Sequence, residues 1–270
     1  DSVGDVSGAS NVGGLIGNAS TSTLTNAFAR GSVTGTSASV GGLFGNYDGG
    51  TLSNVSAGGS GATVRGTYNV GGLIGGGATN PMTITDAYFS GTSVTATSAT
   101  GGDSRVGGLV GHSASTINLT NANVSDISVT GAGNYVGGLT GYASTAVNLT
   151  NAYAKNTTIS SGGGFVGGLA GNMGVAGNAN GGSMVNAYFE GTIALTGAAA
   201  TNINYGGLTG YMVPGSWLSN SYYNIDASTI TIGGTPNKVV SPGGLFTSQY
   251  TAWATPGVTP SSRVPLRIGH

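Results

Sequence analysis

The sequence contains no cysteine, and charged side chains make up only 6% of its 270 residues. Without cysteine, the chain has neither disulfide bonds nor thiolate metal ligands. The formal net charge is −1 and lysine and arginine never cluster, so the basic surface that binds nucleic acid or an anionic membrane is missing. No segment approaches the roughly 20 consecutive apolar residues of a membrane-spanning helix, so we expect no membrane insertion.

Residues that serve common catalytic sites are also scarce. His112 and His270 are the two histidines, and Glu190 is the one glutamate. A catalytic triad or a carboxylate pair therefore has few candidate members, and we expect His112 to face solvent beside a bend of the chain. The glycine-rich segments lack the lysine of phosphate-binding loops and the aspartates of calcium-binding nonapeptides. We predict a protein that is not an enzyme and that uses no cofactor or metal.

Glycine, by contrast, is abundant, with 54 residues. Disordered chains are poor in apolar residues and rich in net charge, whereas the hydrophobic fraction here is 38%. The apolar residues also recur at regular intervals. Both observations predict a folded repeat protein.

A six-residue block of the form Val-Gly-Gly-Leu-x-Gly recurs along the chain. Its copies begin at Val12, Val40, Val70, Val106, Val136 and Val166, with weaker copies at Tyr205 and Pro242. The spacing of 28 to 39 residues between copies is typical of solenoids that carry insertions. We expect the leucines to form one axial core column, namely Leu15, Leu43, Leu73, Leu109, Leu139, Leu169, Leu208 and Leu245.

Two further blocks follow each copy of the first. The second has the form Leu-Thr-Asn-Ala-Tyr, as in residues 149–153, and the third places a β-branched residue mostly between serines or threonines, as in residues 32–34. Such short blocks, bounded by glycine and asparagine, are typical of strands. The sequence therefore predicts an all-β fold, a parallel β-helix-like solenoid of about 7–8 coils with roughly three short strands per coil.

Within the first and second blocks, the recurring apolar residues are three positions apart, so a bend must lie between them if both point inward. Glycine and asparagine tolerate positive φ, and we interpret them as corners of the coil; an inward ladder of asparagine amides is the alternative. The predicted corner residues are Gly13, Gly14, Gly41, Gly42, Gly71, Gly72, Gly107, Gly108, Gly137, Gly138, Gly167, Gly168, Asn26, Asn54, Asp86, Asn121, Asn151, Asn186 and Asn220.

Two outer faces are candidates for binding. Hydroxyl rows flank the third-block residues, as at Thr95 and Thr130, and are interrupted by Arg65 and Ala194. They are either ordinary solvent-facing strand positions or an ice-binding surface. The second face is an aromatic column that either stiffens the solenoid by stacking on itself or binds host or matrix glycans. Its members are Phe28, Tyr88, Tyr153, Tyr188 and Tyr222.

The three blocks together resemble the GLUG repeat of bacterial filamentous-haemagglutinin-like surface and secreted adhesins. The resemblance covers about residues 1–246 and carries over no catalytic residue. It implies an extracellular, β-rich stalk or adhesive module. The segment 247–270 departs from the pattern and contains Pro256, Pro260 and Pro265, so we expect a cap or an assembly arm there.

We expect a secreted or cell-surface protein, a stalk segment or filament subunit that acts by shape and self-association, end to end or laterally, or as part of a larger parent chain. With so few charges, little electrostatic repulsion keeps copies apart. The alternative is a solenoid that presents its hydroxyl or aromatic columns to ice or glycans.

Overall fold

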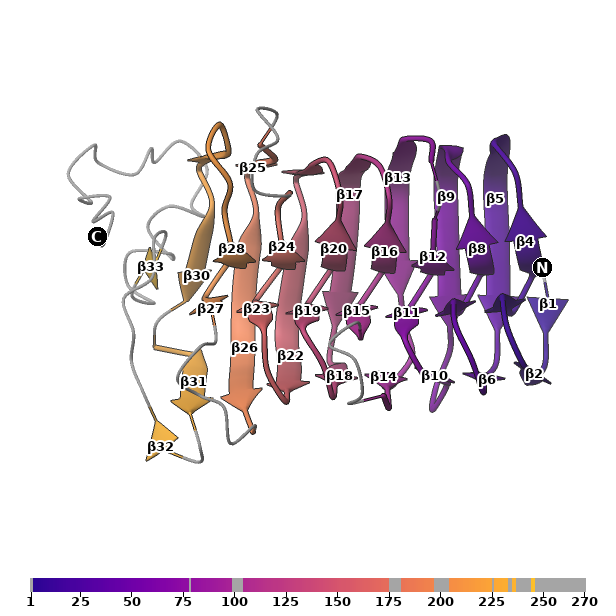
Figure 1. The fold of residues 1–270 in the computed structure, drawn as a ribbon, viewed down its shortest axis with the longest axis horizontal. Helices are drawn as coiled ribbons and strands as arrows, with labels where there is room; N and C mark the ends of the chain where they lie inside the picture. Colours follow the sequence, from indigo (N-terminus) through magenta and orange to yellow (C-terminus); the bar gives the residue numbers. More distant parts are fainter. Residues whose placement is uncertain are drawn as a thin grey trace.

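The computed structural model describes residues 2–77, 79–98, 104–174, 181–196, 204–224, 226–232, 235–236 and 244–245. All regular structure in these residues is β-strand, and none of them belongs to a helix that could cross a membrane. The strands stack along one axis into a rod, with successive turns of the chain side by side (Figure 1). The predicted all-β solenoid is confirmed.

Three sheets run along the rod, and each turn contributes to all three. The longest sheet has 19 strands and combines the second and third sequence blocks. Its strands are β1 (Ser2–Val3), β2 (Val6–Gly8), β5 (Ser22–Arg30), β6 (Val33–Gly35), β9 (Gly50–Gly58), β10 (Thr63–Gly66), β13 (Met82–Phe89), β14 (Ser93–Ala96), β17 (Ile117–Ser125), β18 (Ser128–Gly131), β21 (Val147–Thr150), β22 (Tyr153–Ser161), β25 (Ser183–Val185), β26 (Tyr188–Leu195), β29 (Trp217–Ser219), β30 (Tyr222–Asn224), β31 (Thr229–Ile232), β32 (Thr235–Pro236) and β33 (Gly244–Leu245).

The other two sheets have seven strands each and divide the first block between them. One contains β3 (Val12–Gly13), β7 (Val40–Gly41), β11 (Asn69–Gly71), β15 (Arg105–Gly107), β19 (Tyr135–Gly137), β23 (Phe165–Gly167) and β27 (Asn204–Gly206). The second contains β4 (Ile16–Ala19), β8 (Phe44–Tyr47), β12 (Ile74–Gly76), β16 (Val110–Ser113), β20 (Thr140–Ala143), β24 (Ala170–Asn172) and β28 (Thr209–Tyr211).

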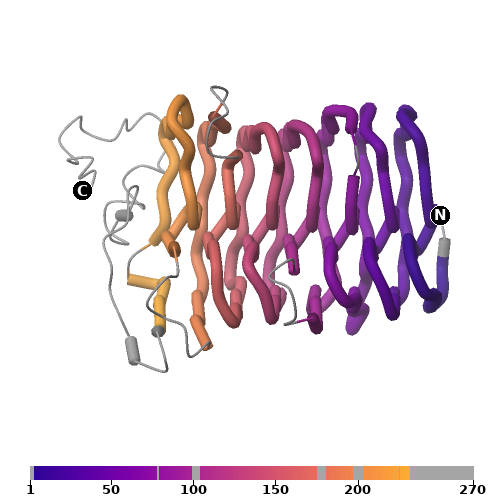
Figure 2. The backbone as a smooth tube through the Cα atoms, viewed as in Figure 1, coloured from indigo at the N-terminus to yellow at the C-terminus, as the bar shows by residue number. Residues whose placement is uncertain are grey.

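Seven strands per short sheet mark seven levels, so the chain makes about six turns from the first level to the last. The tube in Figure 2 follows these turns in one continuous coil. Equivalent residues pair in register, as in Val70 with Val40 and Val106. Every strand pairing in the described residues is parallel except that of β31 with β32, which is antiparallel.

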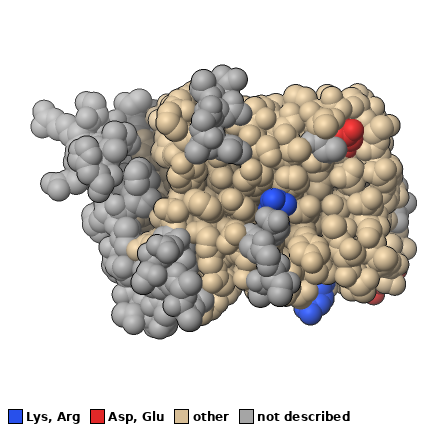
Figure 3. Space-filling model, viewed as in Figure 1, with Lys and Arg blue, Asp and Glu red and all other residues tan. Residues whose placement is uncertain are grey.

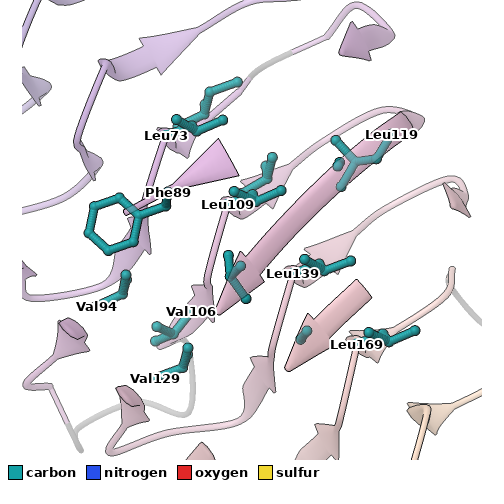
Figure 4. Packing of buried hydrophobic residues seen from close by; sticks show 14 of the residues in the cluster. Leu73, Phe89, Val94, Val106, Leu109, Leu119, Val129, Leu139 and Leu169 are labelled. Atoms are coloured by element: carbon teal, nitrogen blue, oxygen red, sulfur yellow. The ribbon is translucent and has the colours of Figure 1, made fainter. Parts of the chain in front are cut away.

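Backbone hydrogen bonds link the leucines of the core column from one coil to the next; we call this row the leucine spine. The backbone N–H of Leu43 donates to the carbonyl of Leu73 at 2.9 Å, and Leu73 donates in the same way to Leu109. The next residue shares this acceptor, since the N–H of Phe44 also donates to the Leu73 carbonyl. From Leu43 to Leu208 these side chains are buried, and Figure 4 shows Leu73, Leu109, Leu139 and Leu169 in one row.

The end of the repeat differs from the prediction. The eighth copy of the first block was expected to place Leu245 beneath Leu208 in the column. Instead, β33 pairs with β30 in the longest sheet, where Leu245 aligns with Asn224. The predicted boundary at residue 246 and the segment 247–270 lie outside the described residues.

Candidate functional site

The predicted asparagine corners have left-handed backbones. Asn26, Asn54, Asp86, Asn121, Asn151, Asn186 and Asn220 all have φ between 46° and 56°. Their side chains are exposed, so these residues are corners of the coil, as predicted. Their side chains do form a ladder, but it runs along the solvent-facing side of the rod and does not point inward. Asn151 donates to Asn121 at 3.2 Å, and Asn121 donates to Asp86 at 2.9 Å. The ladder is interrupted at Asp86, because a carboxylate has no N–H to donate onward, and it resumes where Asn54 donates to Asn26 at 2.6 Å.

The glycine pairs also lie at bends, but for a different reason. None of the six predicted pairs has a positive φ, so the expected tolerance of left-handed backbone is wrong for them. A Cβ on Gly108 would lie 2.1 Å from the carbonyl oxygen of Gly138 in the next coil. A Cβ on Gly72 would lie 2.7 Å from the ring of Phe89. Glycine is required because two coils and a core side chain meet there.

The predicted aromatic column lies on the outer face of the longest sheet. In register, its order is Phe28, Ser56, Tyr88, Asn123, Tyr153, Tyr188 and Tyr222. Tyr88 is 42% exposed and Tyr153 is 40% exposed, whereas Tyr188 is only 9% exposed. Burial raises the pKa of the Tyr222 phenol above its ordinary value. The exposed rings are therefore concentrated where the column is interrupted by Ser56 and Asn123.

A hollow of about 540 Å³ opens at the first interruption. Phe28 and Tyr88 line it from the coils on either side of Ser56, and Arg30, Ser60 and Ser90 add polar groups. The middle coil contributes only small outward residues here, Ser56 and Gly58, which pair in register with Phe28 and Arg30. The hollow thus arises because one coil has no large side chain between two coils that do.

A second hollow, of about 490 Å³, lies farther along the same face. Tyr153, Lys155, Tyr188 and Glu190 line it together with Asn151, Ala152 and Asn186. The hydroxyl of Tyr188 donates to the Glu190 carboxylate, so the acid of this hollow already has a partner. Its lining contains both charge signs, unlike that of the first hollow.

A second aromatic cluster, which the sequence pattern does not predict, lies on the two short sheets. Tyr135 stacks on Phe165 with ring centroids 5.1 Å apart, and His112 stacks on Tyr142 at 5.6 Å. The Arg105 guanidinium lies 5.1 Å from the centroid of the Tyr142 ring, within range of a cation–π interaction. His112, expected to face solvent, is half-buried. These rings cover one another's faces, which is the geometry of a stiffening ladder.

The hydroxyl rows have the register that the sequence predicts. Thr95 pairs with Thr130 and with Arg65, and Ser160 pairs with Ala194. The row is therefore interrupted at two levels by residues without a hydroxyl. Within the described residues, no group of three or more histidines and carboxylates is arranged to hold a metal ion.

Residues 8–34 match the sequence profile of the GLUG motif. The chain carries a GLUG motif. Gly8 pairs with Gly35 across β2 and β6, so the matched residues make one full turn of the rod, and the GLUG motif is the sequence of a single coil. The chain has no significant match among curated proteins or among solved structures.

Proposed function

We propose that the chain is a cell-surface structural protein, a stalk segment or filament subunit, whose coils are continued end to end by those of another copy or of a longer parent chain. The observation that carries the proposal is the in-register stacking of like coils, as in Val70 with Val40 and Val106, which a further coil of the same kind would continue. Among the described residues, β3 and β4 each pair on one side only, with β7 and β8. A coil of another copy, or of a longer parent chain, would pair with β3 and β4 on their other side, because such backbone groups are a template for another strand.

The side chains at this edge support the same proposal. Leu15 and Leu24 are only partly buried, whereas Leu43 and Leu52 in the next coil are fully buried. Val3, on the outermost strand, is 77% exposed. An added coil would remove these apolar groups from water, which stabilises an assembly by about 25 cal/mol for each Å² buried.

The lateral surface carries little charge to oppose association. Figure 3 shows isolated lysine, arginine and acidic side chains on an otherwise neutral face. Net charge keeps proteins apart in solution, and this chain has a formal net charge of only −1. Copies therefore approach one another without strong electrostatic repulsion.

Sedimentation velocity over a range of protein concentrations, with electron microscopy of the same samples, tests the proposal. We expect rods that lengthen as concentration rises. Val3→Lys places a charge at the open edge and should reduce association, whereas Thr95→Lys adds the same charge to the side of the rod and should leave it unchanged. A wild-type protein that stays monomeric, or association blocked by Thr95→Lys alone, contradicts end-to-end stacking. Immunogold labelling of intact source cells tests the surface location.

A further inference from the structure

We propose that the hollow between Phe28 and Tyr88 binds an acidic sugar, with a pyranose ring between the two aromatic side chains and its carboxylate on Arg30. This inference is independent of self-association, because the hollow lies on the side of the rod. It uses Ser56 as the floor of the site and Ser60 and Ser90 as polar neighbours.

The spacing of the walls fits a sugar ring. Phe28 and Tyr88 both align with Ser56, one coil away on either side, and neighbouring parallel strands lie about 4.8 Å apart. The two aromatic residues are therefore separated by roughly 10 Å along the axis. A planar nucleobase stacked between two aromatic rings needs a separation of only about 7 Å between those rings, at about 3.5 Å for each contact. A chair-shaped pyranose is thicker and presents apolar C–H groups on its faces, so it fills the gap better.

The positive charge of Arg30 at the rim of the hollow favours a ligand with a carboxylate. Arg30 is the one charged residue in the lining, and its guanidinium has no hydrogen-bond or ion-pair partner among the described residues. Arginine binds carboxylates through two parallel hydrogen bonds. A cavity of this size, with aromatic walls and a few polar groups, is typical of small-molecule sites. Uronic acids and sialic acids share the required chemistry, a carboxylate attached to a pyranose ring.

The other aromatic surfaces lack this combination. Tyr153 is as exposed as Tyr88, but its register neighbours are Asn123 and Tyr188, and the nearby hollow includes Glu190. In the second cluster the rings stack on each other. Of these two hollows in the described part of the chain, the first joins two separated aromatic walls to a cation without a hydrogen-bond or ion-pair partner there.

Isothermal titration calorimetry with trigalacturonate and with 3′-sialyllactose tests the site and distinguishes the two sources of acid. Maltotriose and lactose are the neutral controls, and AMP tests a planar base with an anionic group. We expect the intact protein to bind at least one acidic sugar at millimolar concentration and to bind the neutral sugars at least tenfold more weakly, as expected for a lost charge-assisted contact.

Three variants locate the binding. Arg30→Gln should weaken it about tenfold, and Tyr88→Ala should do the same by removing one wall. Ser56→Tyr fills the hollow and continues the column, as Tyr153, Tyr188 and Tyr222 already do on successive coils. It should abolish binding without lowering the thermal unfolding temperature.

Arg65→Gln and Tyr153→Ala are matched controls that should bind as the wild type does. The proposal is overturned if neither acidic sugar binds, if neutral sugars bind equally well, if AMP alone binds, or if the folded Ser56→Tyr variant retains affinity. Circular dichroism of each variant verifies that it is folded.

Discussion

At the scale of single residues, a corner asparagine such as Asn121 both adopts the left-handed backbone of the bend and links neighbouring coils through its side chain. Asn121 has a φ of 52°, accepts a hydrogen bond from Asn151 and donates one to Asp86. A left-handed backbone costs most residues about 1–2 kcal/mol, but asparagine adopts it more readily. The same amide then links three coils along the exposed corner. This double role explains why the sequence repeats asparagine or aspartate at this position.

Two substitutions of Asn121 separate the contribution of its side-chain hydrogen bonds from that of its left-handed backbone. Asn121→Ala should lower the free energy of unfolding by about 2 kcal/mol, since it loses the hydrogen bonds and strains the backbone. Asn121→Gly loses the same hydrogen bonds but accepts positive φ, so it should be about 1 kcal/mol more stable than the alanine variant. Urea denaturation followed by circular dichroism measures both values. Equal stabilities would show that the left-handed corner costs alanine nothing.

Thr140 is a buried residue whose hydroxyl makes no hydrogen bond in the described part of the chain. It is fully buried between Val110 and Ala170 of the adjacent coils, and its Oγ1 has no hydrogen-bond partner in the described part of the chain. Thr140→Val should raise the free energy of unfolding by about 1 kcal/mol, because a buried unpaired hydroxyl is costly.

Thr157 is the matched control for this substitution. It is equally buried, but its hydroxyl donates to the Lys155 carbonyl at 3.1 Å. Thr157→Val should therefore lower the free energy of unfolding by about 1 kcal/mol. Denaturant titrations that place both variants on the same side of the wild type would refute the argument.

At the scale of strands and bends, the glycine pairs determine how closely the coils approach. The bend after β15 brings Gly108 against the backbone of the next coil, where no atom can move aside for a Cβ. Gly163 lies on a turn where an added Cβ would meet nothing within 4 Å, and its φ is not positive. Neither glycine has a positive φ, so the main difference for an added Cβ is the space around it.

We expect Gly108→Ala to destabilise the protein by several kcal/mol or to prevent folding, because close-packed interiors do not absorb an overlap with backbone. Gly163→Ala should remain within about 0.5 kcal/mol of the wild type. Thermal unfolding and the yield of soluble protein measure the difference. A Gly108→Ala variant with a normal unfolding temperature would mean that the coils can separate at the bend.

The sequence predicts those elements that recur in every coil. Repeated leucines and third-block valines set the register, so the solenoid and its core columns follow from spacing alone. The second aromatic cluster could not be predicted this way, because the position of Tyr135 holds Arg105 in the preceding coil and Asn69 in the one before. The hollow at Ser56 is likewise an exception to the pattern. Such features depend on which side chains become neighbours, and this is known only once the register is known.

At the scale of the whole molecule, each coil contacts mainly the coils before and after it, so stability is close to a sum over levels. Asn118 pairs with Asn148, and deletion of residues 118–147 removes one turn and joins Ile117 to Asn148 in register. We expect this variant to fold with the same circular dichroism spectrum per residue and with a lower free energy of unfolding.

Deletion of residues 118–132 is the control, because it removes half a turn and puts inward and outward faces out of register. It should yield no folded protein. If both deletions behaved alike in urea titrations, the turn would not be the unit of folding.

The leucine spine has a mechanical consequence. Its N–H to carbonyl bonds point along the rod, so tension applied between the two ends pulls each bond along its own length, and a level at an end is held by a neighbour on one side only. Levels would peel from an end in sequence, and each would release about 30 residues, or roughly 100 Å of extended chain. Under a suddenly applied force, such a rod would lengthen one level at a time, and its length would decrease again as the levels refold onto the stack.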